Sequence, residues 1–546
     1  MKRSARTLSR ALLAALWLAA APAVGEEPRS LVPRMEPPSS TAPAPPAPIS
    51  VAPLASPDIA AAGLAAVPGW NPDFSRSDPK RLVAMLDRLP TALPSEALAT
   101  RLAARIAAPW AGAGGGVALL AARVRALLRL GAAREAAALA LLGETGGQMN
   151  PELRLLAAEA FATAGEVERA CAVAEPLEAT DTAVVALDFA CALLHGQAPR
   201  ATLALELARE RGILPPASFS TFAEAALSGS PLPVELAEDG TRAARLLLLA
   251  THPLALTATL PASAPPALLR AVARNPEVPV EVRLDAGERA AILGQFTISE
   301  WRSMASTLAD VATASDGRSP SARAHLLRAL AGEGVALARA ALLARAVTAV
   351  AAGSERVRWL EALSVDAEAL PVDRSLLFAE SGILPPLLAR GLFERARAWL
   401  ELAATTPDET RSDRERARLP ATLALAGLSP FPASGDRPSV QRALLHALAD
   451  GLGIAIDADA WTALLVAEMP GDPRPPPSVG LWHAASDAAS SGRRGEAVLA
   501  AFALLAPAVE AAQPQALAHA LTVLRQAGED ELARLLAVAV ALALRL

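Results

Sequence analysis

The chain has 546 residues, of which 53% are hydrophobic and only 3% aromatic. Sandwiches and barrels need more aromatic and β-branched residues, so this composition argues against an all-β fold and favours packed helices. The net charge is −5, and acidic and basic residues are mixed along the chain without a basic arm, which argues against a nucleic-acid-binding protein.

Residues 1–25 have the pattern of a signal peptide. Basic residues at the start precede the apolar stretch "ALLAALWLAA", and small residues follow, so that cleavage after Ala23 or Gly25 fits the small-x-small rule. The apolar stretch is too short to span a bilayer comfortably, and an uncleaved anchor is the alternative. We therefore expect export to the bacterial periplasm, with no stable membrane insertion after cleavage.

Residues 26–62 form a proline-rich segment. Proline fixes φ and removes a hydrogen-bond donor, so this segment is expected to stay extended in water and to act as a disordered linker. A spacer role or a peptide ligand for another module is the alternative interpretation.

Residues 63–215 are predicted to form helical hairpins. In "VALLAARVRALLRLG", Leu120, Val124 and Leu127 fall on one helical face, and the helix is expected to end at Gly131. A second helix follows in "AAREAAALALL". The same order of helix, glycine and helix returns 34 residues later, where "LRLLAAEAFATAG" ends at Gly165.

This spacing resembles the tetratricopeptide repeat, a helix-turn-helix unit of the same period. In that family a small residue follows the turn glycine where the two helices approach closely. The matching pairs are Gly131 and Ala136, Gly165 and Ala170, Gly391 and Ala396, Gly492 and Ala497, and Gly528 and Ala533. The resemblance covers residues 117–211 and 380–546, although the family's Trp and Tyr positions are mostly Leu, Ala or Phe here. It implies an all-α fold, an α-solenoid of stacked helical hairpins.

Cys171 and Cys191 are the only cysteines, and export would place them in an oxidising compartment. If helices over 166–177 and 181–194 form a hairpin, the two residues differ by only ~5 Å along the helix axes. A structural disulfide is therefore predicted. Two buried free thiols are the second interpretation, and a reactive thiol pair is the third.

Residues 216–380 are predicted to be an irregular helical middle with HEAT-like short hairpins and proline breaks, and 381–546 a second tetratricopeptide-like region. Thr297 and Glu300 have the spacing of a capping box at a helix start. Loops are expected at 429–439 and 470–480. The last residues, "LLAVAVALALRL", alternate like a strand, but their place after Gly528 favours a buried final helix.

No complete catalytic or ligand-binding motif is present in the sequence. Ser77 and Lys80 have the Ser-x-x-Lys spacing of penicillin-binding proteins, but the other motifs of that family are missing. A helix start, with Ser77 or Asp78 as N-cap and Pro79 in the first turn, explains these residues. Glu380-Ser381 matches the dipeptide that opens the catalytic domain of soluble lytic transglycosylases, but their Gly-x-Met-Gln segment does not follow. We assign no catalytic residue, no cofactor and no metal.

Stacked hairpins present a long concave surface, whereas their interior is filled by small apolar side chains. The sequence therefore predicts a scaffold or adaptor for protein partners in the cell envelope, without catalysis. A cell-envelope enzyme of unrecognised type, for example one acting on peptidoglycan, is the alternative, as is a structural subunit of a larger envelope assembly.

Overall fold

The computed structural model describes residues 59–143, 150–178, 180–213, 216–237, 239–256, 260–312, 319–350, 352–406, 419–432, 437–466 and 476–546. The predicted signal peptide and almost all of the proline-rich linker lie outside these ranges. The described part of the chain is all-α apart from a pair of two-residue parallel strands, β1 (Leu232–Pro233) and β2 (Leu254–Ala255), and isolated bridges. Pro57–Leu546 form one compact unit.

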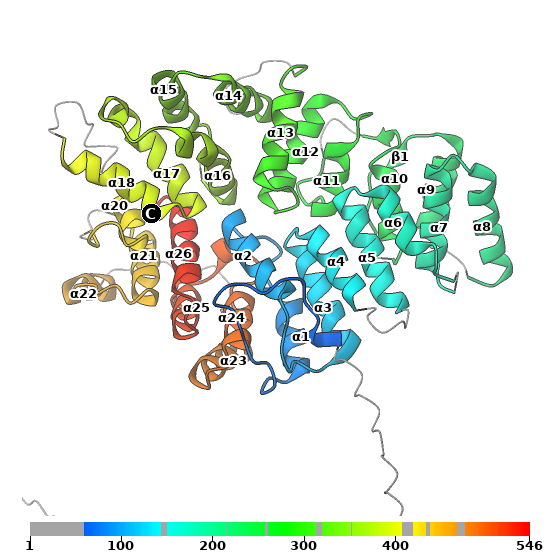
Figure 1. The fold of residues 1–546 in the computed structure, drawn as a ribbon, viewed down its shortest axis with the longest axis horizontal. Helices are drawn as coiled ribbons and strands as arrows, with labels where there is room; N and C mark the ends of the chain where they lie inside the picture. The colour runs from blue at the N-terminus through cyan, green and yellow to red at the C-terminus, as the bar shows by residue number, and fades with distance from the viewer. Residues whose placement is uncertain are drawn as a thin grey trace, which may run out of the picture. The chain divides into compact units, whose positions relative to one another are not determined.

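The helices follow one another in chain order along Figure 1. The first group is η1 (Ile59–Ala61), α1 (Pro79–Asp87), α2 (Glu96–Ala107), α3 (Gly116–Arg129), α4 (Ala133–Leu142), α5 (Pro151–Ala164), α6 (Val167–Ala174), α7 (Thr182–Leu194), α8 (Ala198–Glu210) and α9 (Ala217–Ser228). The second group is α10 (Arg242–Leu249), α11 (Pro266–Arg274), α12 (Val280–Ile292), α13 (Ile298–Leu308), α14 (Pro320–Gly332), α15 (Ala336–Ala346), α16 (Ser354–Ala369) and η2 (Arg374–Ala379). The third group is α17 (Glu380–Arg390), α18 (Phe393–Ala404), α20 (Pro420–Leu425), α21 (Ser439–Gly451), α22 (Ala458–Val466), α23 (Val479–Ser490), α24 (Arg494–Ala503), η3 (Val509–Ala511), α25 (Pro514–Gln526) and α26 (Asp530–Leu544).

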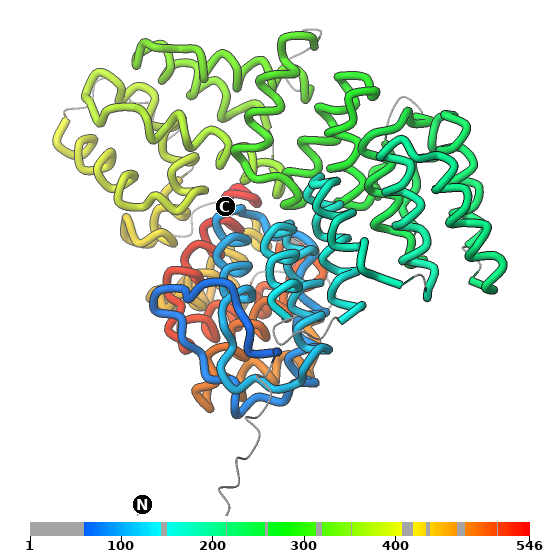
Figure 2. Tube along the Cα trace, turned by 45° about the vertical axis from the view of Figure 1, so that its right-hand side comes forward, coloured from blue at the N-terminus to red at the C-terminus, as the bar shows by residue number. Residues whose placement is uncertain are grey.

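Consecutive helices pack in pairs, among them α3 with α4, α5 with α6, α7 with α8 and α23 with α24. Figure 2 shows the chain running back and forth through these pairs. The turn glycines named above have a left-handed backbone, with φ of +79° at Gly131, +75° at Gly165, +78° at Gly391, +69° at Gly492 and +75° at Gly528. A residue with a Cβ is strained in this conformation, which explains glycine at each turn. The alanines five residues later, Ala136, Ala170, Ala396, Ala497 and Ala533, are all fully buried.

Several local predictions are confirmed by the helix ends. Asp78 is the N-cap of α1, where its carboxylate accepts a hydrogen bond from the Lys80 backbone N–H, and Pro79 is the first helical residue. Thr297 and Glu300 form the predicted capping box at the start of α13. The final segment is the buried helix α26 and not a strand. The predicted loops precede α21 and α23, and residues 433–436 and 467–475 of this part of the chain lie outside the described ranges.

Helices from the N-terminal and C-terminal parts of the described chain pack against each other. Helix α26 contacts α2, α16, α17 and α20, and α1 contacts α24. The blue N-terminal and red C-terminal helices lie together in both Figure 1 and Figure 2. Arg105 on α2 forms an ion pair with Glu529, directly before α26, at 2.5 Å. In an open repeat array each repeat contacts only its neighbours. The repeat pattern in the sequence therefore does not predict this contact between helices that are far apart in the chain.

Candidate functional site

A cavity with a volume of about 820 Å³ follows one face of α5. Helix α5 contributes Glu152, Leu155, Leu156, Glu159 and Thr163 to its wall. The spacing of three, four or one residues places these side chains on a single helical face. Most of the other lining residues come from α3, α7, α10, α11 and the segment before α11. The cavity therefore lies between helices α3, α5 and α7 and the later helices α10 and α11.

The cavity combines an apolar floor with a charged rim. The apolar residues of its wall include Leu128, Leu155, Leu156, Leu187 and Leu293. At the rim, Arg125 and Glu152 are separated by 3.8 Å, and their side chains are 41% and 57% exposed. An exposed pair at this distance contributes little to stability, so both groups are free to exchange partners. Such a cavity suits a peptide segment that pairs aliphatic side chains with polar groups.

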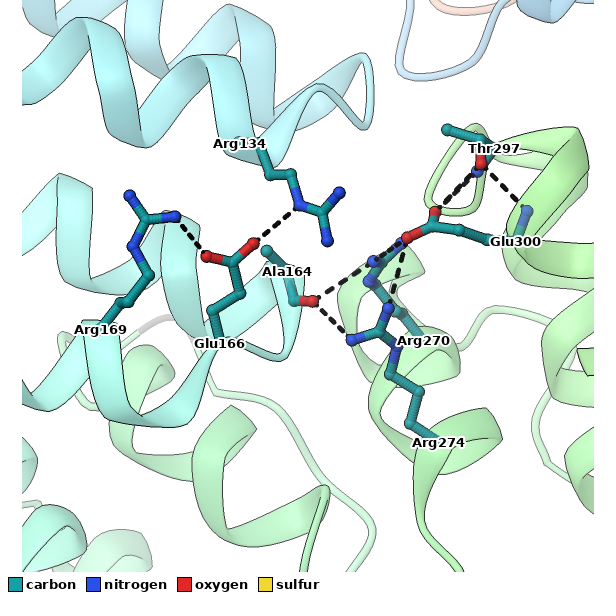
Figure 3. Close-up of polar contacts among 8 residues, drawn as sticks. All are labelled: Arg134, Ala164, Glu166, Arg169, Arg270, Arg274, Thr297 and Glu300. Carbon is teal, nitrogen blue, oxygen red and sulfur yellow. Dashed lines mark hydrogen bonds and ion pairs between the residues drawn. The ribbon is translucent and has the colours of Figure 1, made fainter.

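A cluster of charged side chains lies at the C-terminal end of α5 (Figure 3). We call it the arginine cluster, and its members are Arg134, Arg169, Arg270, Arg274, Glu166 and Glu300. Glu166 accepts hydrogen bonds from Arg134 Nε at 2.7 Å and from Arg169 Nη1 at 2.6 Å. On the other side, Glu300 Oε1 accepts from Arg270 Nη2 at 3.3 Å and from Arg274 Nη2 at 3.4 Å.

The backbone at the end of α5 explains why two arginines meet there. Gly165 ends the helix with a left-handed backbone and leaves the Ala164 carbonyl without an intrahelical donor. Arg274 Nη1 donates to this carbonyl at 2.6 Å, and Arg270 Nη2 donates at 3.3 Å. A Cβ at position 165 would lie 2.2 Å from Arg274 Nη1, so glycine is also needed for this approach. Positive side chains are favourable here because the helix C-terminus carries partial negative charge.

The capping box of α13 orients the acceptor on the other side. Glu300 Oε2 accepts from the Thr297 backbone N–H at 3.1 Å, which leaves Oε1 toward Arg270 and Arg274. Burial alone would raise the pKa of Glu300, but the charge of Arg270, the Thr297 N–H and further arginine contacts outweigh it and hold that pKa below its usual value. Glu300 is therefore ionised at neutral pH. The predicted capping box therefore begins α13 and also orients Glu300 toward Arg270 and Arg274.

The arginines of the cluster also act on one another. Burial, together with the neighbouring charge of Arg274, lowers the pKa of Arg270 to about 10. Both Arg270 and Arg274 lie over the ring of Phe296, at 4.5 and 5.6 Å from its centre. Contact with an aromatic face partly replaces the lost water. The four guanidinium groups of the cluster face its two carboxylates, and Glu135 also acts on Arg134, so positive groups outnumber negative ones.

The two cysteines are joined by a disulfide that links α6 and α7, with a Cα–Cα distance of 5.6 Å. Both line a second cavity, of about 420 Å³, together with His195 and other polar residues. His195 Nε2 lies 3.2 Å from Glu168 Oε2 at its edge. The disulfide thus fixes α6 against α7, and neither cysteine belongs to the arginine cluster.

Sequence reasoning did not identify the arginine cluster. Arg270 and Arg274 are one helical turn apart in "PALLRAVAR", which is a local sign of two arginines on one face. Their partner Ala164, however, lies 106 and 110 residues away, respectively. Neither helical periodicity nor a sequence motif indicates such a long-range contact. The turn glycine Gly165 is the only residue at this place that the repeat pattern singled out.

The other candidates considered from sequence lie apart from this cluster. Lys80 belongs to α1, and Glu380 and Ser381 begin α17. Within the described ranges, no three His, Cys, Asp or Glu residues are placed to hold a metal ion. In the same ranges no helix has both the length and the apolar character needed to cross a membrane. In comparisons with known proteins, the chain matches no family model, no curated protein and no solved structure.

Proposed function

We propose that this protein is a protein–protein interaction scaffold or adaptor that is exported to the bacterial cell envelope and performs no catalysis. In this proposal the paired helices are tetratricopeptide-like repeats of an α-solenoid, with a HEAT-like middle. The observation that carries it is the cavity along α5, whose apolar floor and charged rim suit a segment of a partner protein. The left-handed turn glycines and buried alanines support the repeat interpretation.

Photo-crosslinking in the native cells tests this function at the cavity itself. A photoreactive amino acid is introduced in place of Leu156, which lines the cavity and is only partly buried. Leu203 on α8 provides the control, because its side chain is also aliphatic and is 51% exposed. We expect a discrete crosslinked protein partner from position 156 and none from position 203.

The same experiment can contradict the proposal. If position 156 gives no crosslinked protein while the purified protein converts a glycan or a small molecule, the enzyme alternative replaces the scaffold. Export is tested separately by fusing residues 1–60 to a reporter that is active only outside the cytoplasm. A cytoplasmic reporter would rule out the envelope while leaving the interaction with a partner open.

A further inference from the structure

The arginine cluster contains more positive charge than its structural contacts use. Arg270 and Arg274 hold the end of α5, and Arg169 pairs with Glu166 while its guanidinium lies 4.1 Å from the ring centre of Phe161. Arg134 differs from the others, because its bond to Glu166 is made through Nε alone. A guanidinium has five N–H donors, and the terminal ones form the fork that recognises oxyanions.

Arg134 directs this fork toward the side of Arg270 and Arg274 and away from Arg169 (Figure 3). Figure 3 shows its terminal nitrogens pointing to the side on which Ala164, Arg270 and Glu300 lie. The electrostatics agree with the picture, since the charge of Arg134 acts on the guanidinium groups of both Arg270 and Arg274. The Arg134 side chain is 66% exposed, so a ligand can reach it from solvent.

Arg270 supplies a second observation from inside the cluster. Its side chain is 7% exposed, yet among the described residues its Nε has no hydrogen-bond partner. Its bonds to Ala164 and Glu300 are both 3.3 Å, longer than the usual 2.7–2.9 Å of a charge-assisted hydrogen bond. A buried guanidinium with long bonds and an unpaired donor has capacity for a further acceptor.

The cluster and the cavity share the same end of α5. Thr163 lines the cavity, and the next residue, Ala164, accepts the arginine hydrogen bonds. Gln295 lines the cavity as well, two residues before Thr297, whose backbone N–H donates to Glu300 of the cluster. A peptide segment that lies along α5 over the apolar floor would therefore extend to the arginine cluster.

We propose that the arginine cluster binds an acidic side chain of the partner segment that occupies the cavity, so that the partner carries aliphatic residues followed by Asp or Glu. This inference rests on the proposed interaction function and defines the chemistry of the partner. The ligand is a carboxylate because the cluster already holds one, Glu300, between two arginines. The partner carboxylate binds the fork of Arg134 and offsets the repulsion between Arg134, Arg270 and Arg274.

Binding of a labelled synthetic peptide tests the proposal. The probe is a fluorescent peptide composed of leucine and glutamate, and its matched control has every glutamate replaced by glutamine. With the full chain, fluorescence anisotropy should show binding of the glutamate peptide and at least tenfold weaker binding of the glutamine peptide. The affinity should also fall as salt is added, because the contact is partly exposed.

The variant Arg134→Ala identifies the arginine cluster as the site. Because Arg134 is exposed, the variant should keep its melting temperature and bind the glutamate peptide about tenfold more weakly. Arg209→Ala removes an exposed arginine from α8 and should bind as the wild type does. Arg134→Lys, which keeps the charge but loses the fork, should recover only part of the affinity.

Three results would overturn the acidic-partner inference. They are equal affinity for both peptides, no binding of the glutamate peptide, and unchanged affinity in Arg134→Ala. Inorganic phosphate is the competing source of an oxyanion, and binding of phosphate but not of the peptide, abolished by Arg134→Ala, would assign the cluster to that ion. If any of these results accompanies a crosslink at position 156, only the acidic chemistry fails; a missing crosslink removes the proposed function itself.

Discussion

Glu361 on α16 accepts a hydrogen bond from the hydroxyl of Ser95, 266 residues earlier in the chain, at 2.7 Å. Ser95 is the N-cap of α2, and the same carboxylate accepts the backbone N–H groups of Glu96 at 2.8 Å and Ala97 at 3.1 Å. Glu361 is fully buried and also lies 3.5 Å from Arg358. A carboxylate at a helix N-terminus is favoured by the unpaired N–H groups and the helix dipole. One side chain thus attaches the first helices to the middle of the chain.

Replacing Glu361 should destabilise the protein strongly. Glu361→Ala leaves the N–H groups of Glu96 and Ala97 without their acceptor and removes the carboxylate beside the buried Arg358. We expect a loss of about 3 kcal/mol in the free energy of unfolding. Glu361→Gln keeps one acceptor oxygen and should lose less. Urea denaturation followed by circular dichroism measures both.

The control for this prediction is Glu368→Ala, on the same helix but exposed. It should change stability by less than ~0.5 kcal/mol. If Glu361→Ala were as stable as this control, the contact between α16 and α2 would contribute nothing to the fold.

Replacing Arg123, a buried positive charge, should destabilise the protein about as much as replacing Glu361. It is fully buried in α3, burial lowers its pKa to about 9, and its guanidinium lies 4.5 Å from the ring centre of Trp110. It donates to the carbonyl oxygens of Ala60, Ala62, Ile106 and Ala108 at distances of 2.6–2.9 Å. Arg123→Met keeps much of the volume but removes these four hydrogen bonds, so we expect at least ~3 kcal/mol of destabilisation.

The measurement for Arg123→Met is again urea denaturation, with limited proteolysis to locate the change. Because Arg123 holds the segment of Ala60 and Ala62 through their carbonyl oxygens, cleavage near these residues should become faster in the variant. Arg125→Met on the same helix, at the partly exposed cavity rim, is the control. Equal cleavage of the two variants would contradict the structural role of Arg123.

Local and long-range features of this fold differ in how far the sequence predicts them. The turn at Gly165 and the capping box at Thr297 and Glu300 depend on residues a few positions apart, and both could be predicted. The contact of Arg274 with Ala164 and that of Glu361 with Ser95 could not, because a pair of residues separated by a hundred or more positions leaves no periodic pattern. The candidate site consists mostly of contacts of the second kind, so its residues emerge only from the folded arrangement.

The stability of the arginine cluster should depend on pH through Glu300. Its folded-state pKa lies below the ordinary 4.5, because Arg270 and other donors outweigh the effect of burial. A carboxyl with a lowered folded pKa contributes stability that is present above about pH 4.5 and is lost as the pH falls through the folded pKa. Glu300→Gln cannot titrate, so its melting temperature should be lower than that of the wild type at neutral pH, and the difference should shrink below pH 4.5.

Melting temperatures measured between neutral pH and pH 3 test this dependence. Glu277→Gln, an exposed position between α11 and α12, is the control, and its curve should run parallel to that of the wild type. A constant difference between Glu300→Gln and the wild type over the whole range would show that the carboxylate charge of Glu300 is not what stabilises the cluster.

The disulfide between Cys171 and Cys191 should stabilise the hairpin of α6 and α7. The two residues are 20 positions apart, and closing a loop of this size contributes about 3 kcal/mol in the chain-entropy model. Replacing both cysteines by alanine, which leaves no free thiol, should therefore lower the melting temperature of the protein. A reducing agent should lower the melting temperature of the wild type and leave the double variant unchanged, which separates loss of the bond from loss of packing by the sulfur atoms.

Non-reducing peptide mapping should recover the two cysteines in one linked peptide pair. Rapid alkylation of both thiols in the native, unreduced protein would contradict the bond and assign them as free thiols.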